Sequence, residues 1–355
     1  MLYISSMTPA PKHSTLPPEN IQRTPNIIFN SGPLLICKKL IQTFSTNDTQ
    51  RPPPVAPDIN VKKTRHVRLI TIGPSHFCEK VRWALDILDS DPESDVYYTE
   101  DTHPPLLSCI ATLEASHGLA SMVPMTVSNG EVMHDSQNIL MHFCPFLYPH
   151  DFKEDIVHLE KHFGSHLGAT IRTIIYYYTL QPDYYNVLKD MMTIQTSQIE
   201  SSLWGILLKK GPLAKGMLRA MKIHEDSLEA SLVAVRKTFD DVSAKLNDGN
   251  HKRGQPKYLI GNCFTAADLT FCALASPIIS PPELQSFSPF DRRRMPPEVV
   301  LLQDELRDSP AGKYVLGIYK SHRSIVIPKV VNRNRIIKPL CGVASLVGAI
   351  IAAKL

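Results

Sequence analysis

The first regular pattern in the chain is a β-branched apolar run over His66–Pro74 that ends in Gly-Pro. Such a run predicts a buried strand. Apolar residues then recur at helical spacing from Phe77 to Leu88, and Ser75 stands just before them, where a helix N-cap is preferred. The pattern therefore predicts a strand that leads directly into a helix capped by Ser75.

The next elements are short and alternate in type. The pattern predicts a strand at Asp95–Glu100, a short helix within 104–118, and two strands around Asn129–Gly130, a strong hairpin signal. Another helix begins at Ser136, which we take as its cap, and Pro145 closes it. The order β-α-β-α-β-β-α predicts a small α/β domain over residues 63–148.

From residue 149 to 325 the apolar spacing is helical almost throughout, which predicts an all-helical domain. The stretch 181–222 is longer than a usual link between helices. Thr265 and Asp268 have the spacing of a capping box before an apolar helix, and a last helix pair is expected in 297–323.

The two ends of the chain differ from the middle. Residues 1–62 are rich in Pro, Ser and Thr and poor in acids, a composition that does not form a core. An organelle transit peptide and a plain disordered extension both fit this segment. Residues 326–355 form a basic linker and an apolar tail, in which 339–353 are apolar between Lys338 and Lys354.

About 15 apolar residues are fewer than the ~20 that span a bilayer comfortably. Basic residues precede the tail, and small residues recur in it every four positions. A short membrane anchor is our preferred interpretation of 339–353, and a docked terminal helix or a loosely ordered tail is the alternative. We expect an intracellular protein, cytoplasmic or organellar, and tail-anchored if the first interpretation holds.

Composition narrows the function. With 43% hydrophobic and 20% charged residues, the chain can build a substantial core. A net charge of +4 without blocks of like charge argues against a nucleic-acid partner. The seven cysteines form no CxxC pair and no metal-ligand spacing with the histidines, so we expect neither a disulfide framework nor a metal.

Four stretches in order resemble the soluble glutathione transferases of the serine type. They are Ser75–Leu85, Met122–Phe143, Tyr258–Leu274 and Ser309–Arg323, and the resemblance covers roughly residues 67–323. It implies a thioredoxin-like α/β N-terminal domain and an all-α C-terminal domain, and it suggests a homodimer.

The resemblance also implies glutathione as co-substrate and places Ser75 at the catalytic position. There the hydroxyl donates to the glutathione sulfur, while the N-terminal end of the following helix favours the thiolate. The Val123 backbone, next to a cis Pro124, would pair with the cysteinyl amide. Ser136 would bind the γ-glutamyl carboxylate, and Asp135 its amino group.

One position departs from the family pattern. Many serine-type members carry a lysine before the Val-Pro pair for the glycyl carboxylate, whereas this chain has Met122. His117 is the candidate substitute. Loss of one charged contact weakens binding by roughly 1.5–3 kcal/mol.

Two further features concern the chemistry. Family members that reduce disulfides have a cysteine where this chain has Ser75, so Cys78 is interpreted as a packed thiol. A hydrophobic co-substrate would lie between the domains against the helix with Tyr176, Tyr177 and Tyr178. Successive helical residues are about 100° apart, so one of the three is expected to line the cleft.

Two functions remain open. The first is a transferase that conjugates glutathione to hydrophobic electrophiles or reduces peroxides, with Ser75 stabilising the thiolate. The second is a membrane-associated, weakly active or non-catalytic interaction protein, similar to the ganglioside-induced differentiation-associated proteins. The site residues favour the first, whereas the apolar tail, the long 181–222 stretch and Met122 favour the second. A thiol-disulfide reductase is disfavoured by Ser75.

Overall fold

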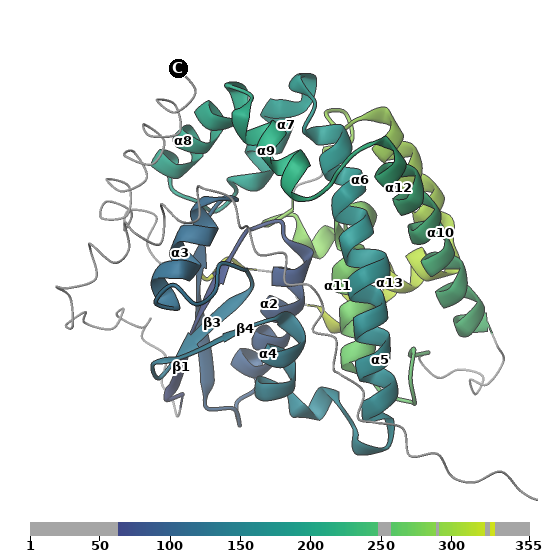
Figure 1. Ribbon diagram of the computed structural model, residues 1–355. Helices are drawn as coiled ribbons and strands as arrows, with labels where there is room; N and C mark the ends of the chain where they lie inside the picture. Colours follow the sequence, from purple (N-terminus) through teal and green to yellow (C-terminus); the bar gives the residue numbers. More distant parts are fainter. Residues whose placement is uncertain (1–62, 248–256, 289–290, 324–326, 331–355) are drawn as a thin grey trace, which may run out of the picture.

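The computed structural model describes residues 63–247, 257–288, 291–323 and 327–330. Its first part contains the predicted order of elements (Figure 1). These are β1 (Arg65–Thr71), α2 (His76–Ser90), β2 (Val96–Thr102), α3 (Leu107–Ala115), β3 (Met125–Ser128), β4 (Glu131–His134) and α4 (Ser136–Phe143).

The strands form one mixed sheet in the order β2-β1-β3-β4. β1 pairs parallel with β2 and antiparallel with β3, and β3 pairs antiparallel with β4. Asn129 and Gly130 both have positive φ, as a tight hairpin turn between β3 and β4 requires. Val67 and Leu69 of β1 pack into the main core, whereas Ile70 packs with Ala111 of α3 on the opposite face.

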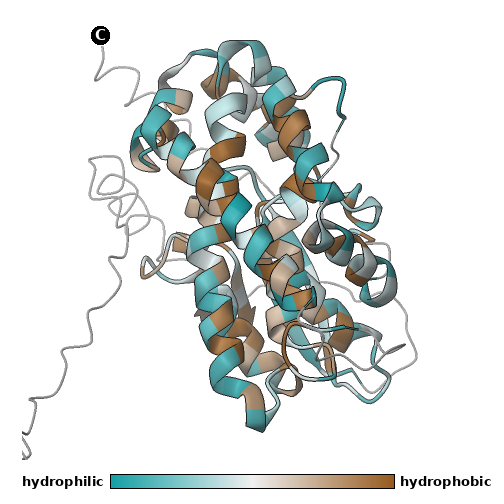
Figure 2. Cartoon of the chain, turned by 90° about the vertical axis from the view of Figure 1, so that its right-hand side faces the viewer, coloured by the Kyte–Doolittle hydropathy of each residue, from teal (hydrophilic) through white to brown (hydrophobic). Residues whose placement is uncertain are grey.

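Helices make up most of the described chain from residue 153 to 322. They are α5 (Lys153–Phe163), a π-helical turn (Gly164–Gly168), α6 (Ala169–Thr179), α7 (Tyr185–Met192), α8 (Gln198–Lys209), α9 (Pro212–Ala220), α10 (Glu225–Asn247), α11 (Ala266–Ile279), α12 (Pro297–Asp308) and α13 (Pro310–His322). Figure 2 shows hydrophilic and hydrophobic positions alternating along the outer helices, as amphipathic packing requires.

Helix α11 is the centre of this helical part, because nearly all of its residues are buried. The predicted capping box is present: Asp268 accepts hydrogen bonds from the backbone N–H and the hydroxyl of Thr265, both at 2.8 Å. The architecture is a thioredoxin-like α/β unit followed by helices, which confirms the predicted fold class.

The expected N-cap of α4 is wrong. Asp135 caps this helix, since its carboxylate accepts hydrogen bonds from the N–H groups of Gln137 and Asn138. Ser136 is the first helical residue. An Asp side chain reaches the second and third N–H groups of a helix, which leaves the next residue inside the helix.

The long stretch 181–222, called here the helical insert, folds into α7, α8 and α9 at the top of Figure 1. It has a hydrophobic core of its own around Trp204 and Leu208, to which Tyr176 of α6 contributes. His103, just after β2, contacts Glu200 of α8 with a distance of 2.7 Å between Nδ1 and Oε1.

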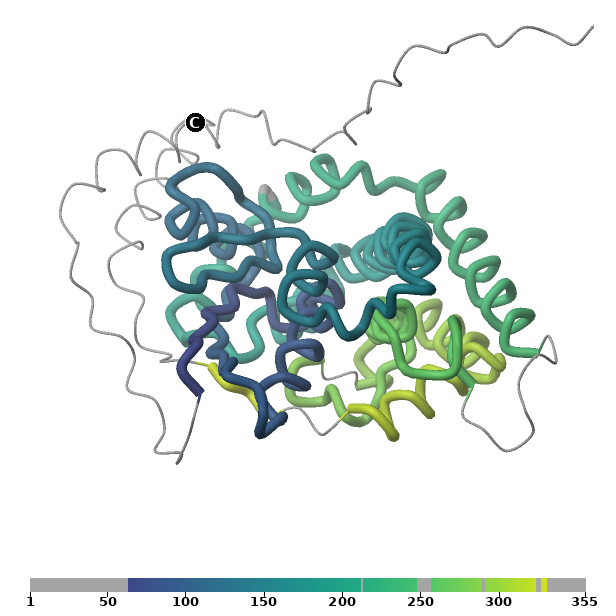
Figure 3. Tube along the Cα trace, turned by 90° about the horizontal axis from the view of Figure 1, so that it is seen from below, coloured from purple at the N-terminus to yellow at the C-terminus, as the bar shows by residue number. Residues whose placement is uncertain are grey.

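After α13 the chain returns to the sheet (Figure 3). The backbone N–H of Glu100 in β2 donates to the carbonyl of Lys329 at 2.9 Å, and Val330 forms a parallel bridge with Glu100. The predicted extension 1–62 and apolar tail 339–353 lie outside the described residues. Within the described ranges, none of the helices has the length and apolarity needed to cross a membrane.

Candidate functional site

Three of the predicted site segments meet at one end of the sheet. Ile70 pairs with Met125, so continuing the antiparallel register brings Val123 opposite Ile72. Met125 pairs in turn with His134, directly before Asp135 and α4. The loop with Ser75, the Val123 backbone and the start of α4 therefore share this end.

Ser75 is the N-cap of α2, as predicted. Its Oγ accepts a hydrogen bond from the Cys78 N–H at 3.4 Å, and its own N–H donates to the Ile72 carbonyl at 3.0 Å. The side chain is half-buried, and a side-chain hydrogen bond links it to the Cys78 sulfur. A serine hydroxyl rotates to suit its acceptor, so its proton is not committed to this sulfur. The Ser75 hydroxyl is therefore able to donate to a bound ligand.

Buried charges on α2 hold the loop that carries Ser75. Arg82 donates to the Gly73 carbonyl at 3.3 Å, to Glu100 of β2 at 2.6 Å and to Glu79 at 2.7 Å. Burial alone would lower the pKa of Arg82, but the charges and hydrogen bonds of the two carboxylates raise it. Thr71 donates to Glu100 at 2.7 Å. The sequence pattern does not reveal this network, because an arginine within a helix is normally expected at a solvent-exposed position.

Cys78 is fully buried, and burial raises the pKa of its thiol to about 11. It stays a neutral thiol at physiological pH, so it is not a nucleophile. This supports the interpretation of Cys78 as a packed thiol.

The peptide bond between Val123 and Pro124 is cis, which confirms the expectation for Pro124. Pro124 is buried and Val123 is half-buried. Among the backbone hydrogen bonds of the described loops and turns, none involves Val123. Its backbone groups are therefore available to pair with an extended peptide.

Asp135 and Ser136 differ in how many hydrogen bonds their side chains already make. Asp135 has a positive φ of 74°, uncommon for a non-glycine residue, and its Oδ1 accepts from the N–H groups of Gln137 at 2.9 Å and Asn138 at 3.2 Å. Ser136 is buried, yet within the described residues its hydroxyl makes no hydrogen bond. Ser136 is thus the freer of the two to bind a carboxylate.

The loop before Val123 carries His117 and Met122. His117 is exposed and has a φ of 52°, and 51% of Met122 is exposed. Within the described part of the chain, neither side chain makes a hydrogen bond or ion pair. The role of His117 in binding the glycyl end stays a prediction.

The three tyrosines of α6 take different environments. Tyr176 is buried, and its hydroxyl lies 3.6 Å from the sulfur of Met192 in the helical insert. Tyr177 and Tyr178 are half-buried and contact each other edge-on, with ring centroids 5.3 Å apart. That one of them lines a substrate cleft stays a prediction.

The helical insert lies directly against the loop of Ser75. A Cβ atom added to Gly73 would lie 2.8 Å from the side chain and 3.1 Å from the carbonyl oxygen of Ile194, in the turn between α7 and α8. The sequence signalled this contact only by the unusual length of 181–222.

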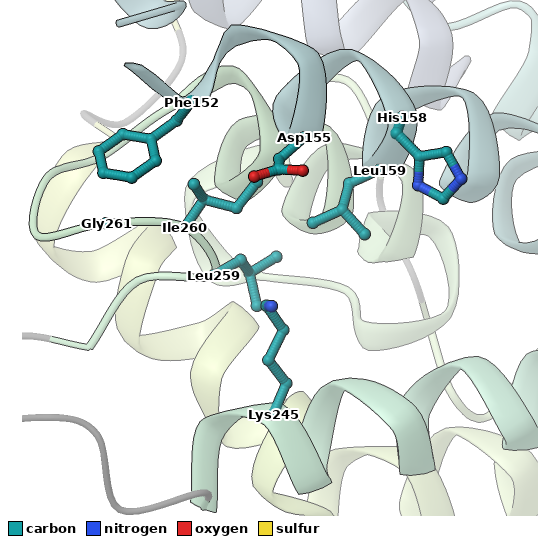
Figure 4. Close-up of a pocket in the computed structure, with 8 residues that line it drawn as sticks. All are labelled: Phe152, Asp155, His158, Leu159, Lys245, Leu259, Ile260 and Gly261. Atoms are coloured by element: carbon teal, nitrogen blue, oxygen red, sulfur yellow. The ribbon is translucent and has the colours of Figure 1, made fainter. Parts of the chain in front are cut away.

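A separate surface depression of about 440 Å³ lies between α5, the end of α10 and the turn at Gly261 (Figure 4). Asp155, His158 and Lys245 are its charged or titratable lining residues. None of the predicted site residues lines this depression.

Comparisons with known proteins give the following result. No protein-family model matches the sequence, and a search of curated proteins finds no significant match. Solved structures do match. A protein of Rhodopseudomonas palustris, described as a possible glutathione S-transferase, is 15% identical, with 76% of this chain and 90% of that chain covered and a TM-score of 0.40.

The beta-etherase LigF of Sphingobium is 16% identical, with 71% of this chain and 98% of that chain covered and a TM-score of 0.43. Ure2p, solved in complex with glutathione, is 14% identical, with 79% of this chain and 99% of that chain covered and a TM-score of 0.42. At this level of similarity function does not transfer between proteins.

Proposed function

We propose that the protein binds glutathione at the sheet end formed by Ser75, Val123 and Ser136 and transfers it to an electrophile. The observation that carries this is the spacing of the three segments. Ser75 follows β1, Val123 precedes β3 and Ser136 follows β4. These three strands are neighbours in the sheet, about 4.8 Å apart. Two strand spacings make about 10 Å, which matches an extended tripeptide.

In the proposed complex the tripeptide lies across the strand ends. The γ-glutamyl carboxylate binds the free Ser136 hydroxyl and the start of α4, and the cysteinyl amide pairs with the Val123 backbone. The Ser75 hydroxyl donates to the sulfur, which favours the thiolate over the thiol. The thiolate then attacks an electrophilic carbon, where a leaving group departs or a π bond breaks, or a peroxide oxygen, where the O–O bond breaks and the released alkoxide takes a proton from water.

Two observations favour the second candidate, a GST-like protein that acts by interaction. Met122 leaves the glycyl end without the family's cation, and the helical insert packs on the Ser75 loop at Gly73. Both would weaken glutathione binding or narrow access to the sulfur. A membrane role through 339–353 belongs to this candidate.

Glutathione binding to the full-length protein, measured by titration calorimetry, separates the two functions. Ser75→Ala and the control Ser309→Ala are measured beside the wild type. Ser309 caps α13 and accepts from Gly312 N–H, so both variants lose one N-cap of the same kind, worth about 1 kcal/mol. A model-electrophile assay accompanies each titration.

We expect wild type and Ser309→Ala to bind glutathione and turn over, and Ser75→Ala to lose about 10²–10³-fold in kcat. The thiol of bound glutathione should also have a lower pKa in the wild type than in Ser75→Ala, read from thiolate absorbance. If the wild type gives no binding heat with glutathione, the transferase hypothesis is wrong and the interaction protein is the remaining candidate.

A further inference from the structure

One face of α6 connects the first turn of α2 with the helical insert. His76, the first residue of α2, donates from Nε2 to the Gly168 carbonyl at 3.0 Å. Gly168 also packs on Phe77, since a Cβ atom there would lie 2.6 Å from that ring. Gly168, Arg172 and Tyr176 are four residues apart and therefore share this face.

Arg172 is the exposed residue between two buried ones. Gly168 is buried under α2, and Tyr176 is buried under the insert, where its hydroxyl lies 3.6 Å from the Met192 sulfur. Eight residues of α-helix rise about 12 Å, and Arg172 lies exposed halfway between the two contacts. Ser75 directly precedes His76, whose side chain contacts Gly168 on this face.

The charge of Arg172 has no partner in the described part of the chain: no carboxylate pairs with it and no hydrogen bond uses its side chain. Arg68, Arg82 and Arg323, by contrast, all pair with carboxylates. Burial lowers the pKa of His76 to about 3, and the positive charge of Arg172 adds to that effect. Burial raises the pKa of Tyr176 to about 12, against the opposing charge of Arg172. Both effects agree with the geometry, because Arg172 lies about one helical turn from Gly168, which His76 contacts, and one turn from Tyr176.

We propose that Arg172 binds a carboxylate or similar anionic group on the electrophile, so that the enzyme prefers acidic electrophiles over neutral ones. The planar guanidinium offers two parallel N–H donors that match a carboxylate. This inference rests on the proposed function, because the electrophile must approach a sulfur held at Ser75. It names the substrate class that the sequence leaves open.

A carboxylated enone illustrates the reaction. The thiolate sulfur forms a bond to the β-carbon, and the carbon–carbon π bond breaks to give an enolate. The α-carbon then takes a proton from water, so no leaving group, oxidant or reductant is needed. Arg172 takes no part in these bond changes and only orients the acid group.

The test uses the full-length protein with two probes that differ only in charge, ethacrynic acid and its methyl ester. The kcat/KM for glutathione addition to each probe is measured for wild type, Arg172→Met, Arg172→Lys and the control Lys313→Met. Lys313 is an exposed cation on α13 without an ion pair in the described residues, so its loss controls for net charge. Circular dichroism checks that each variant is folded.

We expect Arg172→Met to lower kcat/KM for the acid by about 10- to 100-fold and to change the value for the ester less than about threefold. Arg172→Lys should restore part of the loss, and added salt should reduce the preference of the wild type for the acid. Lys313→Met should behave as wild type.

Equal losses for acid and ester, or no loss, would overturn the role of Arg172 while the transferase stands. A wild type that binds no glutathione and conjugates neither probe would overturn the proposed function, and this inference with it.

Discussion

Met122 stands directly before the Val123–Pro124 pair and exposes 51% of its side chain. Its thioether has no charge to offer a carboxylate. Because the side chain is exposed and makes no polar contact in the described residues, a longer charged side chain fits there without repacking the core. The position therefore tests whether a missing cation limits glutathione affinity.

We predict that Met122→Lys tightens glutathione binding by about tenfold or more, because a charged hydrogen bond contributes roughly 1.5–3 kcal/mol. Titration calorimetry measures the change. Leu119→Lys is the matched control, since Leu119 lies in the same loop and is 90% exposed. Equal affinity gains in both variants would mean that general charge, and not a contact at Met122, is responsible.

At this scale the sequence predicts the position of a helix end better than the side chain that caps it. Ser75 is recognisable as a cap because a serine precedes a helical apolar pattern, and the cap bond to Cys78 is present. At α4 the choice between adjacent Asp135 and Ser136 depends on backbone φ, which the residue types leave undecided. The unpaired state of Arg172 depends on every neighbouring element and has no local signal.

At the scale of elements, the turn between α7 and α8 packs on the loop between β1 and α2. Gly73 is buried there, and its backbone φ does not require glycine. What requires a small residue is Ile194, whose side chain and carbonyl would lie 2.8 Å and 3.1 Å from an added Cβ atom. Distances this short force one of the two loops to move.

We predict that Gly73→Ala destabilises the protein by about 1–3 kcal/mol and raises KM for glutathione, because the loop of Ser75 shifts. Urea denaturation and steady-state kinetics measure the two effects. Gly317→Ala is the control: it lies in α13 with no atom near its added Cβ, so it should be neutral or stabilising by up to about 1 kcal/mol. A Gly73→Ala protein as stable as Gly317→Ala would contradict the packing described.

The whole molecule shows where the sequence stops being informative. The order of strands and helices follows from local periodicity, since each element satisfies its own pattern. The position of the helical insert does not, because its contacts join residues far apart in the chain, such as Gly73 with Ile194 and His103 with Glu200. The return of Lys329 to Glu100 at the sheet edge is equally non-local.

His103 joins the insert to the sheet through two carboxylates. It contacts Asp101 at 3.0 Å and Glu200 at 2.7 Å, and Asp101 also pairs with Arg68. Burial alone would lower the pKa of His103, but hydrogen bonds and charges of the two carboxylates outweigh it and raise the pKa from 6.5 to about 10. The histidine is therefore a cation at neutral pH.

Because the folded pKa exceeds the unfolded one, this contact stabilises the fold fully below pH 6.5 and loses its contribution as the pH rises toward 10. We predict that His103→Gln lowers the free energy of unfolding by about 3 kcal/mol at pH 6 and by much less at pH 10. Urea denaturation of wild type and variant across this pH range measures the difference in their free energies of unfolding. The contributions of other titratable groups are the same in both proteins and cancel in this difference. His150→Gln is the control, since His150 is fully exposed and should give a difference near zero at every pH. If the difference in free energy of unfolding between wild type and His103→Gln stays constant from pH 6 to pH 10, His103 is neutral in the folded protein. In that case no ion pair between His103 and Glu200 holds the helical insert against the sheet.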